Sequence, residues 1–206
     1  MDEIDLHAGV ARALDALFAD RLALLCGAGL SMAAPSSLPS AAALAYKAKQ
    51  KYDATYGADR DTVVRLLNEA LATEYVCVLR YYRHYHMASG MLADAVKAEF
   101  LEHAHQEQEH AHQLAERIVQ LGGEPDLDPD TLTARSHAEY KPGTDLRDMV
   151  TEDLVAERIA IDSYRQMINY IGDRDTTTKR ILEGILAQEE EHADEFADLL
   201  NGWIGE

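Results

Sequence analysis

The sequence predicts an all-α fold, a bundle of four helices in which two helical hairpins are joined by a long crossover and preceded by an N-terminal extension. Three observations predict it. The 206 residues contain only five prolines, helical patterns fill most of residues 61–200, and the connections between them are short, long and short. Helices of about 20 to 30 residues would be roughly 30 to 45 Å long, a usual length for such a bundle.

The first predicted hairpin joins helices at about residues 61–88 and 92–121. Asp61 or Thr62 is the expected N-cap of the first helix, because either side chain accepts hydrogen bonds from free backbone N–H groups of the first turn. A Ser-Gly pair ends the first helix and a Gly-Gly pair ends the second. Glycine often ends a helix because it adopts the left-handed backbone conformation at little cost.

The second predicted hairpin joins helices at about residues 146–172 and 175–200, and Asp175 or Thr176 is the expected cap of the latter. The crossover before it, residues 124–144, reads EPDLDPDTLTARSHAEYKPGT and contains three prolines. This composition favours a loop over a further helix.

The formal net charge of −18 argues against a nucleic-acid partner, because no basic stripe can neutralise phosphates. It argues equally against an anionic membrane surface, and no apolar stretch is long enough to span a membrane. Cys26 and Cys77 form no Cys-x-x-Cys pair, which excludes a zinc knuckle. The acidic N-terminus, MDEIDLHAG, does not resemble a secretory signal peptide. We expect a cytoplasmic protein with reduced thiols.

An internal repeat relates the two hairpins. EALATEYVCVLRYYR, from Glu69, aligns without gaps with EDLVAERIAIDSYRQ, from Glu152. EQEHAHQLA, from Glu107, aligns with EEEHADEFA, from Glu189. The first alignment has an offset of 152 − 69 = 83 residues and the second 189 − 107 = 82. Two independent alignments that agree within one residue indicate a duplicated hairpin, so the two halves should present equivalent groups to each other.

The repeated polar residues predict a metal site inside the bundle. Each Glu-x-x-His pair places both side chains on one helix face, and two further glutamates lie within apolar stretches, LLNEALATEYVCVL and DLVAERIAI. Four inward carboxylates would be untenable alone, but two divalent cations offset their charge. One Glu from each of two helices with Glu-x-x-His from each of the other two is the di-iron carboxylate pattern. The six predicted ligands are Glu74, Glu107, His110, Glu157, Glu189 and His192.

Two other Glu-x-x-His pairs, Glu102/His105 and Glu109/His112, lack a counterpart in the repeat and are expected at the surface.

Tyr81 and Tyr164 each follow a predicted ligand, Glu74 or Glu157, by seven residues. Either they hydrogen-bond the ligand carboxylates or they are core aromatics with a satisfied hydroxyl. Of His84 and His86, we expect at least one at the surface.

The sequence resembles bacterioferritin and its relatives in the ferritin-like superfamily over residues 62–200. The stretches that carry the likeness are LNEALATE, EQEHAHQLAERIVQLGGEP, DLVAE and ILAQEEEHADEF. The resemblance implies a centre that oxidises Fe(II) with dioxygen or peroxide, with two iron ions per chain and manganese as an alternative metal. It also implies that Glu107 and Glu189 bridge the two metals. Glu74 and His110 would then complete one site, and Glu157 and His192 the other.

Two departures from the family pattern bear on cofactor and assembly. Gln108 stands where bacterioferritins carry a haem-ligating methionine, so no haem is expected. Only 14 residues follow His192, which is too few for the fifth helix of cage-forming bacterioferritins. We expect a homo-oligomer, a dimer or larger.

Residues 1–60 are predicted to be an extension, partly helical or mobile, before a bundle at residues 61–206. Within it, residues 20–55 contain GAGLS after an apolar run and resemble the opening of a sirtuin-like NAD-binding domain. The stretch is too short for the rest of that fold, and a single Gly-x-Gly is weak evidence for a site.

Three functions are compatible with these patterns. The first is iron oxidation and storage in a multimeric shell, and the second is a di-iron or di-manganese oxidase or peroxidase that stores no mineral. The third is a degenerate bundle that only binds a partner, against which the complete set of predicted ligands argues.

Overall fold

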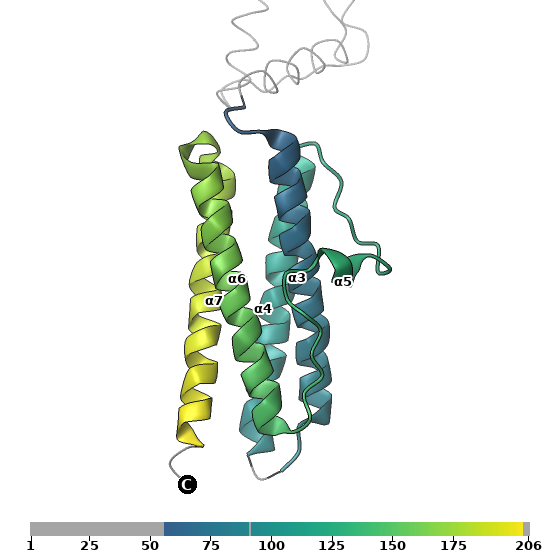
Figure 1. Cartoon of the computed structure of the whole chain (residues 1–206), viewed down its shortest axis with the longest axis vertical. Helices are drawn as coiled ribbons and strands as arrows, with labels where there is room; N and C mark the ends of the chain where they lie inside the picture. The colour runs from purple at the N-terminus through teal and green to yellow at the C-terminus, as the bar shows by residue number, and fades with distance from the viewer. Residues whose placement is uncertain (1–55, 91, 204–206) are drawn as a thin grey trace, which may run out of the picture. The chain divides into compact units, whose positions relative to one another are not determined.

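The structure, a computed structural model, describes residues 56–90 and 92–203. These residues form a bundle of four long helices, with one short helix and one 3-10 turn in the connections (Figure 1). The elements are α3 (Arg60–Met87), α4 (Ala93–Gln120), α5 (Leu132–Arg135), α6 (Leu146–Ile171), η1 (Gly172–Arg174) and α7 (Thr176–Gly202). This architecture confirms the predicted all-α bundle of two hairpins and a long crossover.

The hairpins α3–α4 and α6–α7 are each closely packed, and they meet where α3 contacts α6 and α4 contacts α7. In Figure 1 the crossover runs back along the length of the bundle, so that α6 starts at the end where α4 starts. Buried aromatic rings fill one end of the core, including Tyr81, Phe100 and Phe196. Each such side chain stabilises the fold by about 1.5–3 kcal/mol through removal of apolar surface from water.

The first long helix begins slightly earlier than predicted. The N-cap of α3 is Asp59, whose carboxylate accepts a hydrogen bond from the Thr62 backbone N–H. The same carboxylate accepts the Thr62 hydroxyl at 2.6 Å. The expected caps, Asp61 or Thr62, are therefore wrong, because both lie in the first turn, where Thr62 donates to the true cap.

The second hairpin begins and turns as predicted. Asp145 caps α6, and Gly172 follows that helix with φ +55°, a conformation that glycine adopts without strain. The predicted cap of α7, Asp175, is confirmed, since its carboxylate accepts from the Thr178 backbone N–H at 3.0 Å. That carboxylate also forms a buried ion pair with Arg117 of α4, which links α4 to the start of α7.

The crossover is not wholly the loop that its composition suggested, because it contains the single helical turn α5 against α3. Asn68 of α3 holds its first part, donating to the Glu124 carbonyl at 3.1 Å and accepting from the Asp126 N–H at 2.7 Å. Thr73 accepts from the His137 N–H at 2.9 Å. These contacts give backbone groups of the crossover the partners that they lack within the loop.

The sirtuin-like stretch, residues 20–55, lies outside the described residues, and the proposed division of the chain near residue 60 remains a prediction. The bundle belongs to the unit Gly57–Glu206. Among the helices that the structure describes, none has the length and apolar character needed to cross a membrane.

Candidate metal centre

The six predicted ligands meet in the middle of the bundle, and each is at most 1% exposed. α3 and α6 each contribute one glutamate, and α4 and α7 each contribute a Glu-x-x-His pair. Their neighbours one turn away in the sequence, such as Leu71 and Ile161, are buried core residues. The apolar periodicity of the helices therefore directs these polar side chains inward. The six are Glu74, Glu107, His110, Glu157, Glu189 and His192.

The six side chains form two overlapping groups that could each hold a metal ion. One contains Glu74 and His110, the other contains Glu157 and His192, and both contain Glu107 and Glu189. Within each group the candidate ligand atoms lie within 4.8 Å of one another. Because Glu107 and Glu189 are common to both groups, either could contact two ions, but the bridging role that the resemblance implied remains a prediction.

The histidine nitrogens face these carboxylates directly. His110 Nδ1 lies 3.1 Å from Glu189 Oε1 and 3.5 Å from both Glu74 Oε2 and Glu107 Oε2. His192 Nδ1 lies 3.3 Å from Glu107 Oε1 and 3.7 Å from Glu157 Oε2. Separations of about 3 to 4 Å suit donors that share an ion at roughly 2.0 to 2.2 Å from each.

Each of the six side chains has one buried polar atom without a hydrogen-bond partner among the described residues. These atoms are an oxygen of each glutamate and Nδ1 of each histidine. A buried polar atom without a partner costs about 1–3 kcal/mol, so six around one point demand an explanation. Divalent cations would bind all six, and carboxylate and imidazole donors suit iron or manganese.

Two glutamines that the sequence reasoning missed orient the histidines. His110 Nε2, on α4, lies 2.9 Å from Gln188 Oε1 of α7, and His192 Nε2, on α7, lies 2.5 Å from Gln106 Oε1 of α4. Since an amide oxygen only accepts, Nε2 carries a proton, and Nδ1 is the nitrogen that can bind a metal once it has lost its own proton. The repeat held the signal, because Gln106 and Gln188 immediately precede its Glu107 and Glu189.

Both tyrosines reach the centre, and each contacts a predicted ligand on the opposite hairpin rather than one on its own helix. The Tyr81 hydroxyl donates to Glu157, and the Tyr164 hydroxyl donates to Glu74. Both tyrosines are buried. Each hydroxyl binds one carboxylate oxygen of its glutamate. The other oxygen of Glu74 faces His110, and that of Glu157 faces His192, which is the arrangement expected when a hydrogen-bond donor orients a ligand.

Without a bound metal, the carboxylates of the centre have widely separated affinities for protons. Burial, with the charge of Glu107, raises the pKa of Glu74 well above its usual range. Burial and the charges of Glu107 and Glu157 raise the pKa of Glu189 in the same way. Burial alone would raise the pKa of Glu107 too, but close polar contacts with Glu74, His110 and His192 hold it well below its usual range.

The histidines of the metal-free centre hold protons strongly. Burial opposes this, but ion-pair contacts with Glu107 and Glu157 raise the pKa of His192 to about 10. Contacts with Glu107, Glu189 and Glu74 raise the pKa of His110 still further. In the metal-free centre, bound protons thus partly neutralise the four carboxylates. A metal ion must displace these protons in order to bind.

The two Glu-x-x-His pairs without a counterpart in the repeat lie at the surface, as predicted. Glu102 and His105 are exposed, as are Glu109 and His112, which confirms that these Glu-x-x-His pairs belong to the surface.

His86 is exposed, whereas His84 is fully buried. His84 Nδ1 lies 2.7 Å from Asp153 Oδ2 of α6, and this contact lies outside both metal-binding groups.

Comparison with known proteins gives consistent relatives for the bundle. Residues 64–203 match the family described as the ferritin-like domain. A curated relative, the "DNA protection during starvation protein" of Pyrococcus furiosus, is 31% identical over 150 residues, 71% of this chain and 80% of its own length. A "Bacterioferritin" of Mycobacterium bovis is 29% identical over 133 residues, 64% of this chain and 79% of its own length.

A solved structure supports the same likeness. The dodecameric thioferritin of Bacteroides fragilis, titled a bacterioferritin-related protein, is 32% identical and superposes with a TM-score of 0.70. The match covers 72% of this chain and 89% of that one. The sirtuin-like resemblance expected for residues 20–55 is not borne out, since these matches concern the bundle.

Proposed function

Because the chain belongs to the ferritin-like family, we propose that it is a ferroxidase that oxidises Fe(II) at the centre of its own bundle and retains the Fe(III) product in a homo-oligomer. Fe(II) is the substrate, two ions per chain, and dioxygen or peroxide is the oxidant. The observation that carries the proposal is the convergence of six buried side chains, each with an atom that lacks a hydrogen-bond partner.

The carboxylates of the centre would neutralise the charge of the two ions and hold them in position. Four carboxylates offset the four positive charges of two Fe(II) ions, so the loaded centre adds no net charge to the core. Glu107 and Glu189, which belong to both groups, would hold the ions at a fixed separation, so that both can give an electron to one oxidant molecule. Positioning of this kind lowers the entropic part of the barrier.

The surrounding hydrogen bonds keep the ligands in place while iron enters and leaves. Gln106 and Gln188 fix the ring orientation of the histidines. Tyr81 and Tyr164 hold the terminal glutamates from the opposite hairpin. Because these partners come from other helices than the ligands they hold, the bundle must be assembled before the centre is complete.

The assembly and the partners follow from the relatives. The Bacteroides fragilis protein is dodecameric, and we propose a homo-oligomer for this chain. The name of the Pyrococcus furiosus relative refers to DNA, but a net charge of −18 disfavours association of this chain with phosphate groups. We therefore propose that its partners are iron and the oxidant, in the cytoplasm, and not DNA.

The test is aerobic loading of the metal-free full chain with excess Fe(II), followed by gel filtration and a count of iron per chain. Storage predicts hundreds of irons per chain in a large particle. About two per chain on a small oligomer would instead favour an oxidase that stores no mineral. Glu107→Ala should abolish uptake, whereas Glu109→Ala, exposed two residues further along α4, should not. Uptake that survives Glu107→Ala would contradict the assignment.

A further inference from the structure

A further group of side chains that could hold a metal ion lies beside the centre, toward the end of the bundle where α4 begins and α7 ends. It consists of Glu99 and His103 of α4 and Glu195 of α7, whose candidate ligand atoms lie within 4.8 Å of one another. None of the three belongs to either group of the di-metal centre. Two carboxylates and an imidazole are donors that suit Fe(II).

His103 is the anchor of this cluster and is 1% exposed. Its Nε2 lies 2.7 Å from Glu195 Oε2, while its Nδ1 is buried without a hydrogen-bond partner. In the apolar surroundings of Tyr81 and Phe196, whose rings it meets edge-on, Nε2 is therefore the ring nitrogen that faces the carboxylates and could share a cation with them.

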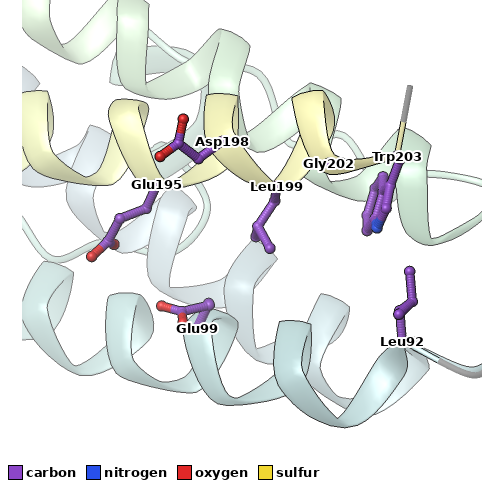
Figure 2. Close-up of a pocket in the computed structure, with 7 residues that line it drawn as sticks. All are labelled: Leu92, Glu99, Glu195, Asp198, Leu199, Gly202 and Trp203. Carbon is purple, nitrogen blue, oxygen red and sulfur yellow. The ribbon is translucent and has the colours of Figure 1, made fainter. Parts of the chain in front are cut away.

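The cluster connects the solvent with the di-metal centre. Glu195 is 44% exposed and Glu99 is half-buried. Both line a surface pocket of about 480 Å³ between α4 and α7, and Figure 2 shows them on facing sides of this gap, with Leu199 further along it. On the inner side, the His103 ring stacks on the ring of His192 at 4.1 Å between centroids.

The repeat shows that the hairpin can form with apolar side chains at the α4 positions of this cluster. With the offset of 82, the counterparts of Glu99 and His103 are Ile181 and Ile185, and the counterpart of Glu195 is Gln113. The duplicated half thus places apolar side chains where α4 places a glutamate and a buried histidine. One half of the molecule carries a polar cluster that the other half lacks, although both fold as the same hairpin.

We propose that Glu99, His103 and Glu195 form a third divalent-cation site, which takes Fe(II) from the pocket and delivers it to the di-metal centre. The exposed carboxylate of Glu195 captures the ion, and the buried imidazole of His103 holds it beside His192. The delivery role rests on the proposed ferroxidase function, but the metal site itself does not.

Anaerobic equilibrium dialysis of the metal-free full chain against Co(II), a divalent ion with similar ligand preferences that does not turn over, tests the site. The wild type should bind three ions per chain, and Glu99→Gln/Glu195→Gln should bind two. The matched control is Glu116→Gln/Glu183→Gln, which removes the same charge from exposed positions of α4 and α7 and should still bind three. In Fe(II) oxidation, Glu99→Gln/Glu195→Gln should raise KM and leave kcat unchanged, because the oxidation site is intact.

The outcomes separate this inference from the proposed function. A wild type that binds only two ions, both lost in Glu107→Ala, would overturn the third site and leave the ferroxidase proposal standing. A third ion retained by Glu99→Gln/Glu195→Gln, or lost equally in the control, would also overturn it. A wild type that binds no Co(II) would overturn both. One ion that survives Glu107→Ala and disappears when Glu99 and Glu195 are also changed would establish a site independent of the centre.

Discussion

Gln106 and Gln188 decide which nitrogen of each histidine faces the metals, although neither is itself a ligand candidate. Gln188→Ala should weaken metal binding by about 10- to 100-fold, the usual effect of losing such a partner, because His110 would be free to rotate or change tautomer. Gln188→Glu keeps the acceptor and should retain affinity. Gln108→Ala, exposed on α4, is the control. Competition between Co(II) and a coloured chelator measures these affinities, and an unaffected Gln188→Ala would show that the helix backbone alone orients the ring.

Tyr164 offers a second test of a single residue that orients a ligand, because its hydroxyl donates to Glu74 from the opposite hairpin. Tyr164→Phe removes one hydrogen bond and leaves the ring in place. We expect the ion bound by Glu74 and His110 to lose about tenfold or more in affinity, with a change in unfolding free energy near 1 kcal/mol. Co(II) titration and chemical denaturation measure the two effects separately. A large loss of stability with unchanged binding would mean that the tyrosine is only a core residue.

Between helices, a buried polar cluster fastens the crossover to the bundle. Arg80 Nε of α3 lies 2.7 Å from Asp153 Oδ1 of α6, and both are at most 1% exposed. The other Asp153 oxygen meets His84, and Arg80 donates to the Glu139 carbonyl of the crossover at 3.1 Å. His84 Nε2 lies 3.1 Å from the Pro142 carbonyl. Three buried side chains thus hold a segment that crosses the length of the bundle.

Asp153→Ala should therefore cost about 3–5 kcal/mol of stability, because it leaves the Arg80 charge buried and uncompensated. It should also make the crossover more sensitive to limited proteolysis. Arg165→Ala, which breaks the exposed pair with Glu190, should cost no more than about 1 kcal/mol. Denaturant unfolding and protease digestion of the two variants measure the difference. Equal stabilities would show that the crossover is held by its other contacts.

The same elements show what the sequence can and cannot predict. The four helices and the six inward residues repeat along the chain, so periodicity and the internal alignment find them. The partners of Asp153 cannot be found in this way, because they lie 69 and more residues away and no counterpart marks them in the repeat. The single turn α5 escaped prediction for a related reason, since it depends on contact with α3 and not on its own composition.

Over the whole molecule, the centre joins the two hairpins, because each group of ligands includes residues from both. Metal binding should therefore oppose separation of the hairpins, and an ion present at 100 times its Kd adds about 2.7 kcal/mol to stability. Removal of metal with a chelator should lower Tm. The exposed Glu102/His105 pair is not expected to contribute, so His105→Ala serves as a control for this shift.

The stability of the metal-free and loaded forms should change with pH in opposite directions. The pKa of His192 rises from 6.5 to about 10 on folding, so its contribution is complete below pH 6.5 and is lost as the pH rises toward 10. The raised pKa values of Glu74 and Glu189 act in the same direction. The lowered pKa of Glu107 does not change the stability between pH 6.5 and 10, because that carboxyl is already ionised in both the folded and the unfolded chain.

Metal ions compete with these same protons, so affinity for Co(II) should increase between pH 6.5 and 8.5, and binding should release protons from both histidines and from Glu74 and Glu189. Thermal unfolding of chelator-treated protein should then show a lower Tm at pH 8.5 than at pH 6.5, while the gain from added Co(II) grows. Calorimetry in buffers of different ionisation enthalpy counts the released protons. A metal-free Tm that rises over this interval would mean that the protons do not hold the four carboxylates together, and that the unloaded centre opens to water instead.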